Sequence, residues 1–184
     1  EEKKYIIEGQ GEKDKAVTDE RPPGFFALAR YKQAWAVMLG RFFLDPVWWM
    51  ILIWLPIYLN DTFGLDIKSI GAFAWVPYVG AAIGSLSGGL FSGYLIARGK
   101  SVNFARKTAI TLGCVVMFLP IILMIFAQNP MQAVLLMSLS NLGFQFAMGN
   151  VMTLASDFFS GKTVGTISGM GGLMSVAGVL ITTN

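Results

Sequence analysis

Two oppositely charged residues, Arg41 and Asp45, lie inside the long apolar stretch Ala34–Tyr58. A spacing of four residues places both side chains on one face of an α-helix. Charge at membrane depth is costly and is tolerated where it is paired or faces a polar cavity, so both residues are candidate functional groups. Two roles stay open: an internal ion pair, or an Arg41 guanidinium that attracts an anionic ligand. Pro46 follows at once and removes a backbone donor, which predicts a kink or an unwound turn.

A second group of candidates lies in the apolar stretch 131–157, which is unusually polar for its length. Helical spacing puts Asn141 and Gln145 on one stripe and Asn150 and Thr153 on another. Amides at membrane depth either bond to neighbouring helices or face a cavity, and both alternatives stay open for each residue. Two polar stripes on one helix favour a cavity beside at least one of them.

The composition predicts a membrane protein with a polar leader. Hydrophobic residues make up 54% of the chain and charged residues only 14%, whereas an ordinary globular chain has about 25% charged residues. Half of the 14 lysines and arginines fall in residues 1–32. This separation is typical of a membrane protein and does not indicate a nucleic-acid partner.

Several kinds of chemistry are excluded by what the chain lacks. It has no histidine and one cysteine, Cys114, so a histidine-based hydrolase triad, a disulfide framework and a thiolate metal site cannot form. No nucleophile and base accompany Arg41, Asp45 and Asp157, the charges that lie in or near the apolar stretches. We therefore predict that the chain is not an enzyme and uses no cofactor or metal.

The periodicity predicts an all-α integral membrane fold. Five apolar stretches are long enough to span a bilayer, namely 33–59, 70–97, 108–128, 131–157 and 163–183. Small residues recur every four positions in the second span, as Gly80, Gly84 and Gly88 and as a neighbouring stripe of Ala81, Ser85, Gly89 and Gly93, which favours close helix packing. The glycine-rich fifth span leaves room for a ligand. Trp48 and Trp49 lie too deep for an aromatic belt at the membrane surface, so both join the candidates.

The chain divides into a leader and a membrane domain. Residues 1–32 are predicted to be a cytoplasmic loop with a short interfacial helix or a plain linker at 25–32, and residues 33–184 form the membrane half-domain. Basic residues of the leader, of Arg98–Lys107 and of Lys162 share one side, whereas Lys68 stands alone on the other. The positive-inside rule makes the first side cytoplasmic.

Several motifs resemble one transporter family: GRFFLDPVWW at Gly40–Trp49, RGKSVNFARK at Arg98–Lys107, GNVMTLASDFF at Gly149–Phe159 and VGTISGMGG at Val164–Gly172. The chain resembles helices seven to eleven of the twelve-helix major facilitator superfamily, without helix twelve. Within it, the chain is most similar to the anion:cation symporter family and to bacterial hexuronate transporters. The resemblance implies the C-terminal half of an inner-membrane protein, whose N-terminal half holds the residues that couple protons and bind the carboxylate.

The function implied by this resemblance is proton-coupled uptake of a sugar-acid anion, such as glucuronate or galacturonate, by alternating access. We predict that Gln145 and Asn150 contact sugar hydroxyls, because amides offer both donors and an acceptor, and that Trp48 or Trp49 is an apolar platform for the sugar ring. Two alternatives stay open. One is a carrier for another solute, such as galactonate, glucarate, an organic phosphate, a dicarboxylate or a neutral sugar; the other is a membrane module that transports nothing.

Overall fold

The computed structural model describes residues 24–183, and within that range every regular element is a helix. Five segments are long and apolar enough to cross a membrane, which confirms the predicted fold class and number of spans. They are Lys32–Phe63, Ile67–Ala97, Val102–Phe126, Pro130–Phe158 and Thr163–Thr182. Most of the predicted leader, residues 1–23, lies outside the described residues.

The helices in chain order are α3 (Phe25–Leu28), α4 (Lys32–Phe63), α5 (Ile67–Phe73), α6 (Val76–Ala97), α7 (Val102–Leu123), the 3₁₀ turn η1 (Met124–Phe126), α8 (Pro130–Phe158) and α9 (Lys162–Thr183). Three of them begin at a side chain that accepts a backbone N–H bond from the first turn. These caps are Asp66 for α5, Ser101 for α7 and Asn129 for α8. Hydrogen bonding to Ser69, first to its side chain and then to its backbone N–H, holds the pKa of Asp66 below its ordinary value.

Three predicted spans differ from the structure. The first span continues to Phe63 and does not end at 59. The third span begins at Val102 and not at 108, because Ser101 caps the helix inside what was predicted to be a loop. The second span is not one helix: it consists of α5 and α6, separated at Ala74 and Trp75, with Pro77 in the first turn of α6. Proline suits a helix start, where its missing N–H has no partner to lose.

The unwound turn predicted at Pro46 is also wrong, because α4 is helical from Lys32 to Phe63. A proline cannot donate to the carbonyl four residues before it, which here is that of Phe42. Gly178 of α9 packs directly against this carbonyl and against the Pro46 ring, and a Cβ at position 178 would overlap them. The close approach of a second helix covers the backbone group that the proline leaves without a partner.

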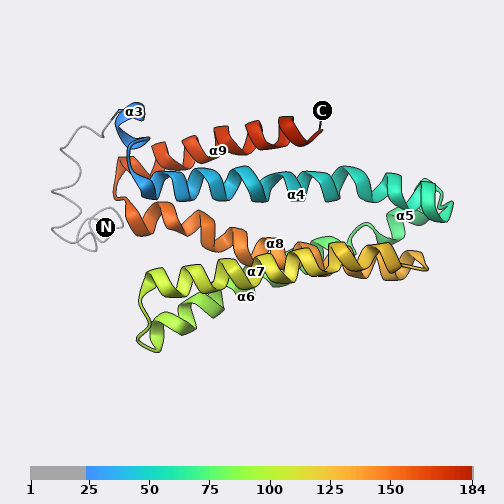
Figure 1. Ribbon diagram of the computed structural model, residues 1–184. Coiled ribbons are helices and arrows are strands. Elements are labelled where there is room, and N and C mark those ends of the chain that lie inside the picture. Colours follow the sequence, from blue (N-terminus) through green and yellow to red (C-terminus); the bar gives the residue numbers. More distant parts are fainter. Residues whose placement is uncertain (1–23, 184) are drawn as a thin grey trace, which may run out of the picture.

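Helix α8 is the centre of the bundle. In an apolar segment of 18 residues within α8, 61% of the residues are buried, compared with 22–33% in the corresponding segments of the other spans. Helices α4, α6 and α7 pack around α8, and α9 packs mainly on the far side of α4 (Figure 1). The α6–α7 and α8–α9 connections lie at the same end of the bundle as α3, as the distribution of basic residues predicts.

Small residues bring the central helices together. Gly80, Gly84 and Gly88 lie against the α8 backbone at Ser138, Leu142 and Phe146, which confirms the first small-residue stripe as a packing surface. In the second stripe, nothing lies within 4 Å of where a Cβ would be at Gly89 or Gly93. That part of the second stripe therefore faces open space and not a neighbouring helix of the described chain.

Candidate functional site

Arg41 and Asp45 form an ion pair within α4. The Arg41 Nε donates to Asp45 Oδ2 at 3.2 Å, and Nη2 lies 3.1 Å from the same oxygen. Arg41 Nη1 also donates to the carbonyl of Ser168 in α9, at 3.4 Å. Asp45 is buried, and its negative charge is tolerated there because the counter-charge of Arg41 lies one helical turn away. Of the two predicted roles, this geometry is the internal ion pair.

The glycines of α9 leave space that Arg41 occupies. A Cβ at Gly171 would lie 3.0 Å from Arg41 Cδ, and one at Gly172 would lie 3.6 Å from Nη1. The room expected for a ligand beside this part of α9 is therefore filled by a side chain from α4. The absence of side chains at these glycines lets α9 approach a charged residue that would otherwise keep the two helices apart.

Three aromatic rings from three helices meet near the middle of the bundle. Trp48 of α4 stacks on Phe144 of α8, with ring centroids 5.6 Å apart and an interplanar angle of 23°. Tyr78 of α6 meets Trp48 edge to face, with centroids 6.0 Å apart. Phe144 is 4% exposed, whereas Trp48 is partly exposed and Tyr78 is 51% exposed. We call these three residues the aromatic platform. Phe144 supports the Trp48 indole from below, and the rings of Trp48 and Tyr78 form the exposed surface of the platform.

Two amide side chains lie beside the platform on α8. Asn141 is only 3% exposed, and its Oδ1 is buried without a hydrogen-bond partner in the described chain. Its neighbours Met137 and Phe144 belong to the two apolar clusters that join α8 to α4. Gln145 is partly exposed, and within residues 24–183 its side chain makes no hydrogen bond.

The side of α8 that Gln145 occupies follows from its neighbours. Gly143 and Ala147 contact α7, and Gln145 lies two residues from each, which is about 200° around the helix. Gln145 therefore points away from α7, toward the side where Trp48 of α4 and Tyr78 of α6 meet. The platform and Gln145 form one surface of mixed aromatic and polar character, and the Asn141 amide is buried next to it.

Two predicted site residues do not join this surface. Trp49 is exposed and makes no ring contact within the described residues. The hydroxyl of Thr153 donates to the carbonyl of Asn150 in its own helix, at 2.9 Å. These two residues keep their predicted role in the pathway only as a hypothesis.

Asn150 belongs to a second polar cluster, at the end of the bundle where α7 begins. Its Nδ2 donates to the carbonyls of Gly88 and Phe146, at 3.1 and 2.9 Å, and its Oδ1 accepts from Arg106 at 3.1 Å. With 1% exposure and both ends of the amide bonded, its arrangement is that of an interhelical contact.

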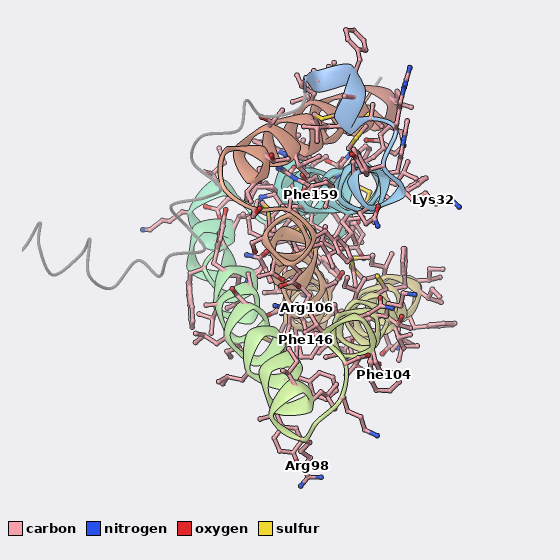
Figure 2. The ribbon with its side chains drawn as sticks, turned by 90° about the vertical axis from the view of Figure 1, so that its left-hand side faces the viewer. Lys32, Arg98, Phe104, Arg106, Phe146 and Phe159 are labelled. Atoms are coloured by element: carbon pink, nitrogen blue, oxygen red, sulfur yellow. The ribbon has the colours of Figure 1, made fainter. Side chains whose placement is uncertain are left out.

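Arg106 is the centre of this second cluster and was missed as a site residue. Its Nε donates to Asp157 Oδ2 at 2.8 Å and its Nη1 to Ser92 Oγ at 2.9 Å, so one guanidinium joins α6, α7 and α8. Figure 2 shows Arg106 between these helices, whereas Arg98 points away from the bundle. The prediction placed Arg106 in a loop; the serine cap at Ser101 was the signal that could have placed it on a helix.

No metal centre is found in the described part of the chain, where no three His, Cys, Asp or Glu side chains come together. The candidate site is thus the surface made by the platform and Gln145, with the buried Asn141 amide next to it and the Arg41–Asp45 pair on the same helix as Trp48. Its chemistry is hydrogen bonding and apolar stacking.

Comparison with known proteins gives a consistent result. The family model described as Major Facilitator Superfamily matches residues 3–183. The hexuronate transporter of Escherichia coli (strain K12) is 33% identical over 175 residues, which cover 94% of this chain and 40% of that protein. The galacturonate transporter of Dickeya chrysanthemi is 33% identical over 65% of this chain and 35% of its own length. The D-galactonate transporter of Escherichia coli O6:H1 (strain CFT073) is 31% identical over 84% of this chain and 36% of its own length. The chain therefore spans no more than 40% of the length of these relatives.

Proposed function

The chain belongs to the Major Facilitator Superfamily, and we propose that it is the C-terminal half of a transporter that takes up a hexuronate anion together with a proton. The curated relatives described above are transporters for hexuronate, galacturonate and D-galactonate, which supports a sugar acid as the substrate. The proposal places the protein in a bacterial inner membrane, with residues 1–32 in the cytoplasm. Alternating access moves the two halves of the protein around a site at the membrane midplane.

The observation that carries the proposal is a group of polar atoms at mid-depth that have no partner. The Trp48 indole N–H, the Tyr78 hydroxyl, the Gln145 amide and Asn141 Oδ1 form no hydrogen bond within residues 24–183. Trp48 lies at the middle of α4, and Gln145 lies near the middle of α8. An unpaired polar group costs free energy in an apolar surrounding, so several together indicate a surface completed by a polar ligand.

A sugar acid suits this surface. The sugar ring supplies apolar C–H groups that pack on the platform, and its hydroxyls supply donors and acceptors to Gln145 and Asn141. Asp45 already neutralises Arg41, so we expect the carboxylate and the coupled proton to bind groups in the N-terminal half of the complete protein. The partners of this chain are then that half, the lipid bilayer, the sugar acid and the proton.

The test uses the complete protein that contains this chain, expressed in bacteria that lack their own uptake of sugar acids. Uptake of labelled glucuronate, galacturonate and galactonate is measured with and without a protonophore. We expect uptake of a hexuronate that stops when the proton gradient collapses. No uptake of any sugar acid, by a protein shown to be in the membrane, contradicts the proposal, whereas uptake that persists without a gradient contradicts only the coupling.

A pair of matched variants links uptake to the site. Gln145→Leu should lower hexuronate uptake about tenfold or more, because a site that hydrogen-bonds a hydroxyl loses that contact. Gln132→Leu is the control, since Gln132 is an exposed glutamine on the same helix and outside the candidate site. Equal uptake by both variants would remove Gln145 from the substrate pathway.

A further inference from the structure

The aromatic platform indicates which chemical form of a sugar acid binds to the candidate site. This inference rests on the proposed function. Hexuronates close into six-membered pyranose rings, whereas aldonates such as galactonate lack the aldehyde and stay open chains or form lactones. Both kinds have six carbons and one carboxylate. We propose that the Trp48–Tyr78–Phe144 platform selects the closed pyranose form of a sugar acid over open-chain sugar acids.

The platform is held in place before any ligand binds. Phe144 is buried and lies nearly parallel to the Trp48 indole, with an interplanar angle of 23°, and Tyr78 meets the same indole at 77°. Each ring comes from a different helix, so the indole is supported on two sides. Rings held in this way lose little conformational freedom when a ligand packs on them.

A pyranose ring matches such a surface in shape. One face of the ring presents several C–H groups in a nearly flat array, which can cover an aromatic ring without burying a hydroxyl. An open chain distributes its hydroxyls around a flexible backbone. Packing it on the same rings requires several bonds to be fixed and some hydroxyls to be desolvated, and both requirements weaken binding.

The amides beside the platform suit the edge of the ring. Asn141 Oδ1 is a buried acceptor without a partner, so it favours an O–H donor and disfavours a carboxylate. Among the described residues, the cation nearest to Trp48 along α4 is Arg41, which is already paired with Asp45. A ring hydroxyl is therefore the group expected here, and an open-chain diacid would bring a second carboxylate to a surface that offers it no counter-charge.

The first experiment needs no variant. Uptake of labelled galacturonate by the complete protein is measured against three competitors: the 1,5-anhydro analogue of galacturonate, whose ring cannot open, then galactonate, then galactarate. We expect the ring-locked analogue to compete nearly as well as galacturonate, and both open-chain acids to be about tenfold weaker. Open-chain acids that compete as well as the ring-locked analogue overturn the proposal, even if galacturonate uptake is intact.

Variants then assign the preference to the platform. Trp48→Leu and Tyr78→Leu should reduce the ratio between ring-locked and open-chain competitors to near one, whereas Tyr78→Phe, which keeps the ring, should preserve that ratio. Trp54→Leu and Tyr94→Leu are controls on the same two helices, because both rings are exposed and lie outside the platform. If a Leu variant does not reach the membrane, Trp48→Met and Tyr78→Met, which also remove the ring, take its place. A ratio unchanged in every ring-removing variant that reaches the membrane overturns the assignment.

The outcomes separate this proposal from the proposed function. Galacturonate uptake that open-chain acids inhibit as well as the ring-locked analogue overturns the preference for rings and leaves the proposed function intact. Uptake of galactonate but not of galacturonate overturns both the preference for rings and the choice of a hexuronate, and leaves a sugar-acid transporter. Uptake of neither compound overturns the proposed function and the ring preference together.

Discussion

The ion pair between Arg106 and Asp157 should be one of the strongest single contributions to the stability of the bundle. The two side chains are 16% and 20% exposed, and Arg106 also donates to Ser92 and Asn150. Removing one partner of a buried ion pair costs about 3–5 kcal/mol, because the remaining charge stays buried without a counter-charge. Here the partial exposure and the two remaining acceptors of Arg106 reduce that cost for changes at Asp157.

We therefore expect Asp157→Leu to lower the free energy of unfolding by about 2–3 kcal/mol. Arg106→Leu should cost about 3–4 kcal/mol, since it leaves both Asp157 and the buried Asn150 oxygen without their partner. In the double variant no lone charge remains, so the combined cost should be about 2 kcal/mol or more below the sum of the two single costs. Lys107→Leu, at an exposed position next to Arg106, should change stability by less than about 0.5 kcal/mol.

The assay is chemical unfolding of the complete protein in detergent, followed by tryptophan fluorescence, for the four variants and the unchanged protein. The double-mutant cycle gives the coupling energy between the two side chains. If the cost of the double variant equals the sum of the single costs, the two charges do not depend on each other and the reasoning is refuted.

Two further predictions concern the interior of the bundle. Arg41→Ala and Asp45→Ala should each lower the free energy of unfolding by about 2 kcal/mol, whereas the double variant should lose less than either, because a lone buried charge is the costly state. Chemical unfolding of the three variants measures these costs. A double variant less stable than both single variants contradicts the pairing. Asn141→Leu should raise the free energy of unfolding by about 1 kcal/mol, because it removes a buried acceptor that has no partner, and it should lower hexuronate uptake. Unfolding and transport are measured on the same preparation. A less stable variant with normal uptake would show that the oxygen has another role.

Features that depend on neighbouring residues could be predicted from the sequence. The five spans follow from the length of each apolar stretch, and the contact between Arg41 and Asp45 follows from a spacing of one helical turn. The stripe of Gly80, Gly84 and Gly88 predicts a close helix contact, although not that α8 is the helix contacted. The glycine-rich character of α9 likewise indicates tight packing, but not that Arg41 fills the space.

Features that join distant residues could not be predicted in this way. Arg106 and Asp157 are 51 positions apart, and nothing in the sequence around either residue indicates the other. Tyr78 looks like an ordinary aromatic residue near a helix end, and only the arrangement of α4, α6 and α8 brings it to Trp48. Asn150 and Asn141 have the same residue type and similar surroundings in the sequence, yet one is fully bonded and the other has a free acceptor.

The placement of the Arg41–Asp45 pair within one helix has a consequence for biosynthesis. Arg41 and its α9 partner Ser168 are 127 residues apart, so roughly 10 s of translation separates them at about 5–20 residues per second. During that interval α4 has to enter the bilayer without the helix that later covers this region. An intrahelical counter-charge lowers the cost of insertion for an arginine whose helical neighbour does not yet exist. A counter-charge supplied by α9 would arrive too late, so the i, i+4 arrangement lets α4 insert before α9 is made.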